Sequence, residues 1–196
     1  MITPRTTRLL RVPDLQAMHR ALAECVRAHR SAPAAIIVPT AGAAEALART
    51  LAIIAPPAVD LLTRDEFYLR LHARFRSAAP MLTAFEREVL LTRAASAASD
   101  SGTPAPFRLR PGLIVEMLAF YDELRRRDRT VADLDRLMTD SLQPSVEIDR
   151  GAERLFRQTQ FLTAAFTRFE ELVGSSGRLD EHALRRLLLV HDGSAS

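Results

Sequence analysis

The chain contains no lysine, no asparagine and no tryptophan, so all 27 residues of the lysine and arginine type are arginines. A Walker-type phosphate-binding loop needs a lysine that reaches the β and γ phosphates of a nucleotide, and a PD-(D/E)XK nuclease needs one beside its metal-binding carboxylates. Schiff-base enzymes, Ser-Lys dyads and kinases also depend on lysine. Arginine cannot replace it as a proton acceptor because it stays charged. We therefore expect this chain alone neither to hydrolyse ATP nor to cleave nucleic acid.

Cysteine is almost absent as well, since Cys25 is the single one. One cysteine forms no intrachain disulfide and no thiolate zinc site, which favours a reducing compartment, and we expect the cytoplasm. No apolar run approaches the roughly 18 residues that span a bilayer. The first segment, Met1 to Val12, is too short and too interrupted by arginine for a signal peptide. We expect a protein with no membrane role.

Catalytic constellations are missing too. The histidines are scattered, with no HExxH motif and no His-x₃₋₅-His pair next to carboxylates, so we expect surface or helix-end histidines: His19, His29, His72, His182 and His191. Gly174 to Gly177 lacks the preceding strand of a nucleophile elbow. Glu116, Asp122 and Glu123 favour surface carboxylates over an acid-base pair. We predict no catalytic residue, no metal and no cofactor.

The first third of the chain alternates short apolar runs with helical patterns. The runs cover residues 8–12, 35–39 and 58–62, and the helical patterns that follow them cover 14–30, 43–52 and 65–76. Such alternation predicts an α/β fold, with a short parallel sheet covered by helices. Thr63 and Glu66 form a capping-box pattern that starts the third helix.

The rest of the chain is predicted to be all-helical. Helical patterns cover residues 85–98, 111–127, 131–137, 147–173 and 181–190, and Thr83 with Glu86 repeats the capping box. We therefore predict a division into an α/β region, residues 1–80, and a helical region, residues 81–196.

Two apolar stripes indicate how these helices pack. One comprises Leu113, Met117, Phe120 and Leu124. The other has a period close to 3.5 and comprises Ile148, Ala152, Leu155, Thr159, Leu162, Phe166, Phe169 and Val173. We expect Gly174 to end the long helix.

The positive charge is concentrated at the start of the chain. Residues 1–80 hold 11 arginines against 6 acidic residues, whereas residues 81–196 hold 16 against 18. A basic N-terminal half is compatible with nucleic acid, although arginine in place of lysine also fits a bias in genomic base composition. The cluster Arg125 to Arg129 either grips phosphate or complements the carbonyl end of a helix.

The segment from Val38 to Leu51 is the most informative, because a strand runs into a tight turn with Thr40 and Gly42 and then into a helix. At the carboxyl edge of a parallel sheet, the amides and hydroxyl of such a turn can contact phosphate. An ordinary strand-to-helix turn fits the segment equally well.

This segment, with Thr40, Ala43, Ala44, Leu47 and Arg49, resembles motif Ia of superfamily 1 helicases, which contacts the single-strand backbone. Leu62 to Leu71 resembles the Thr-Phe-His-Ser-Phe stretch that follows it, and the helical half is similar to the 1B insertion. Leu109 to Leu124 and Asp149 to Leu155 resemble the N-terminal region of AddB-like helicase-nuclease subunits.

The resemblance implies a helicase 1A-like, P-loop-like but degenerate α/β region followed by a 1B-like region. Where the Walker A loop belongs, the chain has Val12 to Gln16. Walker B carboxylates and the nuclease domain would lie beyond residue 196, so we expect a front portion or fragment.

The implied function is a non-catalytic scaffold that guides single-stranded DNA beside a helicase-nuclease motor subunit. DNA binding is expected at Thr40, Gly42, Ala43 and Arg64. Of the adjacent rings of Phe67 and Tyr68, at most one can face a groove while the other packs inward.

A helical protein-protein interaction module with no nucleic-acid role is the alternative. Its partner would bind the two apolar stripes described above, and it would not show salt-sensitive binding to single-stranded DNA. The resemblance to the helicase-nuclease family also implies an incomplete domain, whose exposed strand edge and uncovered apolar face predict self-association or a partner.

Overall fold

The computed structural model describes residues 7–28, 34–54, 59–75 and 78–190. These residues form two compact units, one that extends to Ala78 and one from Ala79 to Val190. The first is an α/β unit and the second is helical, so the chain is mostly helical with one small parallel sheet. Within the described parts of the chain, no helix is both long enough and apolar enough to cross a membrane.

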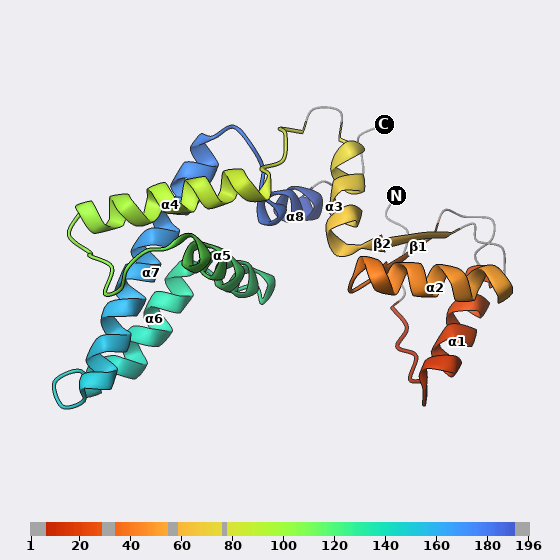
Figure 1. Ribbon diagram of the computed structural model, residues 1–196, viewed down its shortest axis with the longest axis horizontal. Helices are drawn as coiled ribbons and strands as arrows, with labels where there is room; N and C mark the ends of the chain where they lie inside the picture. Colours follow the sequence, from red (N-terminus) through yellow and green to blue (C-terminus); the bar gives the residue numbers. More distant parts are fainter. Residues whose placement is uncertain (1–6, 29–33, 55–58, 76–77, 191–196) are drawn as a thin grey trace. The chain divides into compact units, whose positions relative to one another are not determined.

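The N-terminal unit contains a two-stranded parallel sheet (Figure 1). Its elements are α1 (Leu15–Ala28), β1 (Ala34–Val38), α2 (Ala41–Ile54), β2 (Val59–Thr63) and α3 (Arg64–Ala73). A small core forms where Ala23 of α1, Leu47 and Leu51 of α2, and Val38 of β1 pack together. The helix α3 contacts both strands, and it follows β2 with no intervening residue.

The run from Arg8 to Val12 was predicted as a strand, and that prediction is wrong. These residues have no regular secondary structure, and Leu9 is 81% exposed. A strand is stabilised when one of its faces is buried against neighbours. Here Arg8 and Arg11 interrupt the apolar residues, and the three of them that are large are all exposed. The described sheet therefore has two strands instead of three.

The second unit is a helical bundle. Its elements are α4 (Ala84–Asp100), α5 (Pro111–Arg126), α6 (Val131–Leu142), the short 3₁₀ helix η1 (Gln143–Ser145), α7 (Arg150–Ser175) and α8 (Glu181–Val190). The long helix α7 packs against both α4 and α6 (Figure 1). Phe161, Phe166 and Phe169 of α7 and Leu91 of α4 are fully buried in the core.

Both predicted apolar stripes are displaced in part. In α5 the buried residues are Ile114, Met117, Leu118, Tyr121 and Asp122, whereas Phe120 is exposed. In α7 the buried face also includes Phe161 and Ala165, because two helices cover it, while Leu155 is exposed. Ile148 lies before the helix and is 87% exposed.

The ends of the helices follow local capping chemistry. The capping boxes predicted at Thr63 and Thr83 are present, and each threonine side chain accepts a hydrogen bond from the backbone N–H of the glutamate three residues on. A third box at Thr130 uses Asp133 in the place of glutamate, and it was not predicted. The prediction that Gly174 ends α7 is wrong, since the helix continues to Ser175 and Gly177 adopts the left-handed backbone (φ +67°).

Candidate functional site

The parallel register of the sheet brings the predicted DNA-binding segments to one edge. Val38 is paired with Thr63, so the carboxyl ends of β1 and β2 are level. Thr40 lies two residues after Val38, and Arg64 directly follows Thr63. Carboxyl edges of parallel sheets are where α/β proteins bind ligands. We call this place the strand-end edge.

The turn into α2 holds three of the four predicted residues. The Thr40 side chain accepts a hydrogen bond from the backbone N–H of Ala43 (3.2 Å), and its carbonyl oxygen accepts from Ala44 (3.1 Å). The Ala43 amide is therefore engaged, in contrast to its predicted role as a phosphate donor. Among the described residues nothing accepts from the amides of Ala41 and Gly42, so these two donors at the start of α2 remain available.

Gly42 is not required by the backbone at this turn. A Cβ atom placed on it would meet only the Thr40 Oγ1, at 4.0 Å, and its φ is not in the left-handed region. α2 has no acidic residue in its first turn, which preserves the positive end of its dipole.

Arg64 at the start of α3 has a partly compensated charge. Its Nη2 lies 3.1 Å from Asp65 Oδ1, and both side chains are exposed. Glu66 accepts from the Thr63 backbone N–H (2.7 Å) and from the Thr63 hydroxyl. The backbone hydrogen bond from Thr63 is the main reason that the pKa of Glu66 is lowered. The start of α3 therefore already has its own anion, and only the Arg64 side chain can serve an external phosphate.

The two adjacent aromatic residues of α3 are both half-buried, with ring centroids 6.2 Å apart. Phe67 lines a groove of about 470 Å³ between α3 and the sheet, together with Arg70 and Arg74. Arg70 also forms an ion pair with Asp60. As expected from their spacing, the two rings do not share one groove, since Tyr68 is not among the lining residues.

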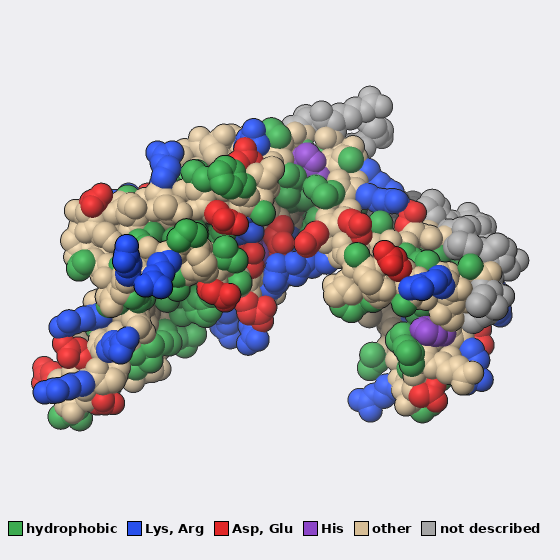
Figure 2. Space-filling view, viewed as in Figure 1, with side chains coloured by type: hydrophobic (Ala, Val, Ile, Leu, Met, Phe, Trp, Pro, Cys, Tyr) green, Lys and Arg blue, Asp and Glu red, His purple; other side chains and the backbone are tan. Residues whose placement is uncertain are grey.

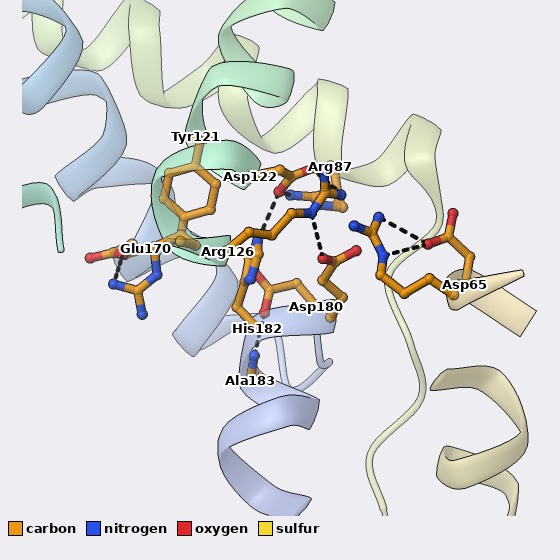
Figure 3. Close-up of polar contacts among 12 residues, drawn as sticks. Asp65, Arg87, Tyr121, Asp122, Arg126, Glu170, Asp180, His182 and Ala183 are labelled. Carbon is orange, nitrogen blue, oxygen red and sulfur yellow. Dashed lines mark hydrogen bonds and ion pairs between the residues drawn. The ribbon is translucent and has the colours of Figure 1, made fainter. Parts of the chain in front are cut away.

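A second polar assembly lies inside the helical unit (Figure 3). Arg87 of α4 binds Asp122 of α5 through both carboxylate oxygens, at 2.6 and 3.1 Å. His182 of α8 places its Nε2 2.9 Å from the same carboxylate. Arg126 of α5 bonds Glu181 at 3.2 Å. We call Arg87, Asp122, Arg126, Glu181 and His182 the buried ion cluster.

Burial alone would raise the pKa of Asp122, but the hydrogen bonds from His182 and Arg87 hold it well below its ordinary value. The predictions for both residues are corrected accordingly. Asp122 is a buried carboxylate rather than a surface one, and His182, although near a helix end, is only 5% exposed. An ionised, buried carboxylate persists because its cations and hydrogen bonds replace water.

Beside this cluster, Tyr121 donates a hydrogen bond to Glu170 of α7 (3.0 Å), and Arg125 Nη1 lies 3.7 Å from the same carboxylate. Burial and the Glu170 charge raise the pKa of Tyr121. The assembly thus joins α4, α5, α7 and α8 through ion pairs among its own side chains, and Arg87 Nε and Arg125 Nε are its two buried atoms without a hydrogen-bond partner in the described residues. Among the described residues no group of three His, Cys, Asp or Glu side chains could hold a metal ion.

The sequence did hold a signal for Asp122. Ile114, Met117, Leu118, Tyr121 and Asp122 follow the i, i+3, i+4, i+7, i+8 spacing of one helix face. A carboxylate within such a face needs a buried partner. Its partners, Arg87 and His182, lie 35 and 60 residues away in the chain, and no local pattern connects them.

The helical unit also has an exposed apolar groove. It has a volume of about 340 Å³ and is lined by Phe85 and Val89 of α4 and by Leu109, Pro111 and Ile114 at the start of α5. Phe85 is 72% exposed. Figure 2 shows hydrophobic side chains exposed over α4. A groove of this kind accepts apolar side chains of a partner.

No protein-family model matches the chain, and no curated protein matches it.

Proposed function

We propose that this chain is a non-catalytic scaffold that guides single-stranded DNA, the front portion of an AddB-like helicase-nuclease subunit that acts in DNA repair and recombination. The observation that supports it best is the parallel register of β1 and β2, which aligns the turn at Thr40 with the start of α3 at Arg64. In the helicase family the corresponding turn contacts the strand backbone. The resemblance therefore agrees with the geometry of the strand-end edge.

A motor subunit is the partner that this role requires, because the chain itself has no lysine for ATP chemistry. The work of strand movement comes from that partner, and the scaffold holds the strand in place. The cytoplasm, where DNA repair takes place in a cell without a nucleus, is the compartment that fits this proposal.

Three kinds of donor are present for a phosphate at the strand-end edge. The Thr40 oxygen accepts from Ala43, and its own hydrogen can donate outward. The amides of Ala41 and Gly42 lie at the positive end of α2. Arg64 adds an exposed guanidinium that shares its charge with Asp65. Phe67 lies in a separate groove, which also includes Ala34, Ala35 and Asp60 near the amino ends of the strands, so a base stacked on its ring would extend the binding path along α3.

The binding is expected to be weak, independent of sequence and sensitive to salt. Each phosphate neutralised on a single strand contributes a slope of roughly −0.7 in log K against log salt. Two phosphates therefore predict an affinity about sevenfold lower at 200 mM salt than at 50 mM. No base-edge reading is expected, because the available donors are amides, a hydroxyl and one arginine.

The experiment is a fluorescence titration of the whole chain with a labelled oligothymidylate at both salt concentrations. Thr40→Glu and Arg64→Glu are each expected to weaken binding at least fivefold, because each places a negative charge at the strand-end edge.

Two controls make the result specific. Arg20→Glu makes the same change of charge on an exposed residue of α1, outside the segment that resembles motif Ia, and is expected to weaken binding less than twofold. Thr40→Ser keeps the capping hydroxyl and should bind like the parent. Binding that is absent at 50 mM salt, or that falls equally in Arg20→Glu and Arg64→Glu, would remove the strand-end edge from consideration.

A protein-interaction module is the second candidate, and the apolar groove beside Phe85 favours it. The predicted partner-binding surface, the two apolar stripes, is not available as a whole. Met117, Phe166 and Phe169 of these stripes are buried within the helical unit itself. A partner would instead cover Phe85 and Val89. Under this function, single-stranded DNA would not bind at either salt concentration.

A further inference from the structure

We propose that the helical unit contains a binding site for a phosphate monoester group, in a pocket between the end of α5 and the face of α8. The pocket has a volume of about 100 Å³, and among its lining residues are Arg125, Asp128, Arg129, His182, Arg185 and Arg186. We call it the arginine pocket. It belongs to the helical unit alone and does not depend on the proposed function of the strand-end edge.

The local structure explains why these arginines converge. His182, Arg185 and Arg186 are spaced i, i+3 and i+4 along α8, which places them on one face of the helix. At the end of α5, Asp128 adopts the left-handed backbone (φ 59°). The Arg129 amide then bonds the Leu124 carbonyl (3.1 Å), which turns the chain so that Arg129 also lines the pocket.

The charge of the pocket is only partly balanced by the protein. Four arginines and one aspartate line it, and Arg125 also pairs with Glu170 at 3.7 Å, which leaves an excess of two positive charges. Arg129, Arg185 and Arg186 form no ion pair with any residue that the structure describes.

The acidic residues nearby are already engaged. Asp122 binds Arg87 and His182, Glu170 binds Tyr121, and Glu181 binds Arg126.

One buried group among the lining residues has unused hydrogen-bonding capacity. Arg125 Nε is buried and has no hydrogen-bond partner within the described part of the chain. His182, which also lines the pocket, is fixed through its Nε2 by Asp122. Because buried polar groups are normally satisfied, the unpartnered Arg125 Nε favours a polar occupant of the pocket.

Phosphate is the anion that matches this pocket best. Guanidinium groups bind phosphate oxygens in bidentate fashion, and several can surround a tetrahedral group. A monoester carries close to two negative charges at neutral pH, which suits the excess of two positive charges better than a carboxylate or a diester does. The volume is several times what one water molecule needs, and it is too small for a nucleotide base in addition.

The test is calorimetric titration of the whole chain with inorganic phosphate at constant ionic strength. The double variant Arg129→Gln/Arg186→Gln is expected to lose at least tenfold in affinity. Both side chains are exposed and unpaired in the described structure, so the fold should be unaffected, which thermal unfolding checks. Arg127→Gln is the matched control, because Arg127 is at the same helix end but pairs with Glu123 and is absent from the pocket lining.

A second arm identifies the source of the phosphate group. An oligothymidylate with a 5′-phosphate is compared with the same strand bearing a 5′-hydroxyl, both on a background of Thr40→Glu to remove the strand-end edge. Tighter binding of the phosphorylated strand, lost in the double variant, assigns the pocket to a DNA end. Binding of inorganic phosphate alone assigns it to a small phosphate ester.

Two results would overturn the proposal. One is the absence of saturable phosphate binding at millimolar concentration. The other is an equal loss of affinity in Arg127→Gln and in the double variant, which would show only a general effect of net charge. Neither result bears on Thr40 and Arg64, so this proposal and the proposed function fail separately.

Discussion

Asp122 is the residue on which the helical unit depends most for its polar interactions. Its carboxylate accepts from Arg87 and lies against His182, so one side chain joins α4, α5 and α8. Removing one partner of a buried ion pair leaves the others charged and unsatisfied, which costs more than the pair itself contributes.

Asp122→Ala is therefore expected to lower the free energy of unfolding by about 3 kcal/mol, as measured by urea denaturation. Glu123→Ala is the matched control on the neighbouring, exposed position, where loss of the ion pair with Arg127 should cost about 0.5 kcal/mol or less. Equal effects of the two substitutions would mean that the buried ion cluster contributes nothing beyond a surface pair.

The lowered pKa of Asp122 also predicts how stability depends on pH. A carboxylate whose pKa is lower in the folded chain contributes stability that is fully present above its unfolded value, 3.8. That stability is lost as pH falls below this value toward the folded pKa. The parent should therefore lose stability between pH 5 and 3 more steeply than Asp122→Asn in urea titrations, and parallel curves would contradict the assignment.

Single residues show where sequence reasoning succeeds and where it fails. The capping boxes at Thr63 and Thr83 were predicted correctly because both partners lie within four residues of each other. Asp122 was assigned to the surface because its partners are remote in the chain. His182 was missed for the same reason. Local chemistry is readable from sequence, whereas pairing across the core requires the fold.

Among the elements, the end of α5 shows a conflict between backbone and side chain. Asp128 holds φ at 59°, a conformation that glycine adopts at no steric cost and that a residue with a Cβ adopts under strain. At Gly177, after α7, the chain uses glycine in the same conformation (φ +67°).

At Asp128 and Gly177, opposite substitutions are expected to change the free energy of unfolding in opposite directions. Asp128→Gly should raise the free energy of unfolding by about 0.5 kcal/mol, because relief of strain exceeds the added entropy of the unfolded chain. Gly177→Ala should lower it by about 1 kcal/mol, although nothing lies within 4 Å of the new Cβ, since the cost is conformational. Thermal or urea unfolding measures both, and a change of the same sign in the two variants would contradict the argument.

The elements themselves were predicted well where the apolar pattern was long. The eight α-helices of the described structure coincide with predicted ones, while boundaries shifted, as in α7, which begins after Asp149 because that side chain accepts from the Gly151 N–H. The strand at Arg8 was wrong because five residues with two arginines give no reliable period. The buried face of α5 is rotated by about one residue from the predicted stripe. The sequence fits both faces, and only the packing of α5 against α7 decides which of the two is buried.

For the whole molecule, the two units differ greatly in the core they bury. In the described part of the N-terminal unit the buried apolar side chains are Ala23, Val38, Leu47, Leu51 and Leu62. The helical unit buries three phenylalanines fully and many more side chains around them. Ile37 of β1 is 52% exposed, so one face of the sheet is incompletely covered.

Hydrogen exchange should therefore separate the two units. Amides of α4 and α7 are expected to exchange near the rate of global unfolding, and those of β1, β2 and α2 at least a hundredfold faster, because less apolar area holds them. Mass spectrometry of exchanged peptides measures this. Uniform protection across both units would mean that they unfold as one.

The strand-end edge could be located from the sequence because topology fixes it: parallel strands of similar length place their carboxyl ends together. Which groups are available there could not be predicted. The Ala43 amide is taken by Thr40, and Arg64 shares its charge with Asp65, two details that depend on side-chain geometry. Only the α5 part of the arginine pocket could be predicted from the sequence. The cluster Arg125 to Arg129 was identified there, whereas Arg185 and Arg186 of α8 were not.

Thr63 has a mechanical consequence. It is the last residue of β2 and also the N-cap of α3, so the strand and the helix share a residue and no slack separates them. Its capping box fixes the angle at which the helix leaves the strand. A force that shifts the end of β2 along the strand axis is transmitted directly to α3, because the junction between them is rigid. Tension on a nucleic-acid strand bound at the strand-end edge would therefore act along the whole of α3. The two-residue turn before α2 can absorb the same displacement.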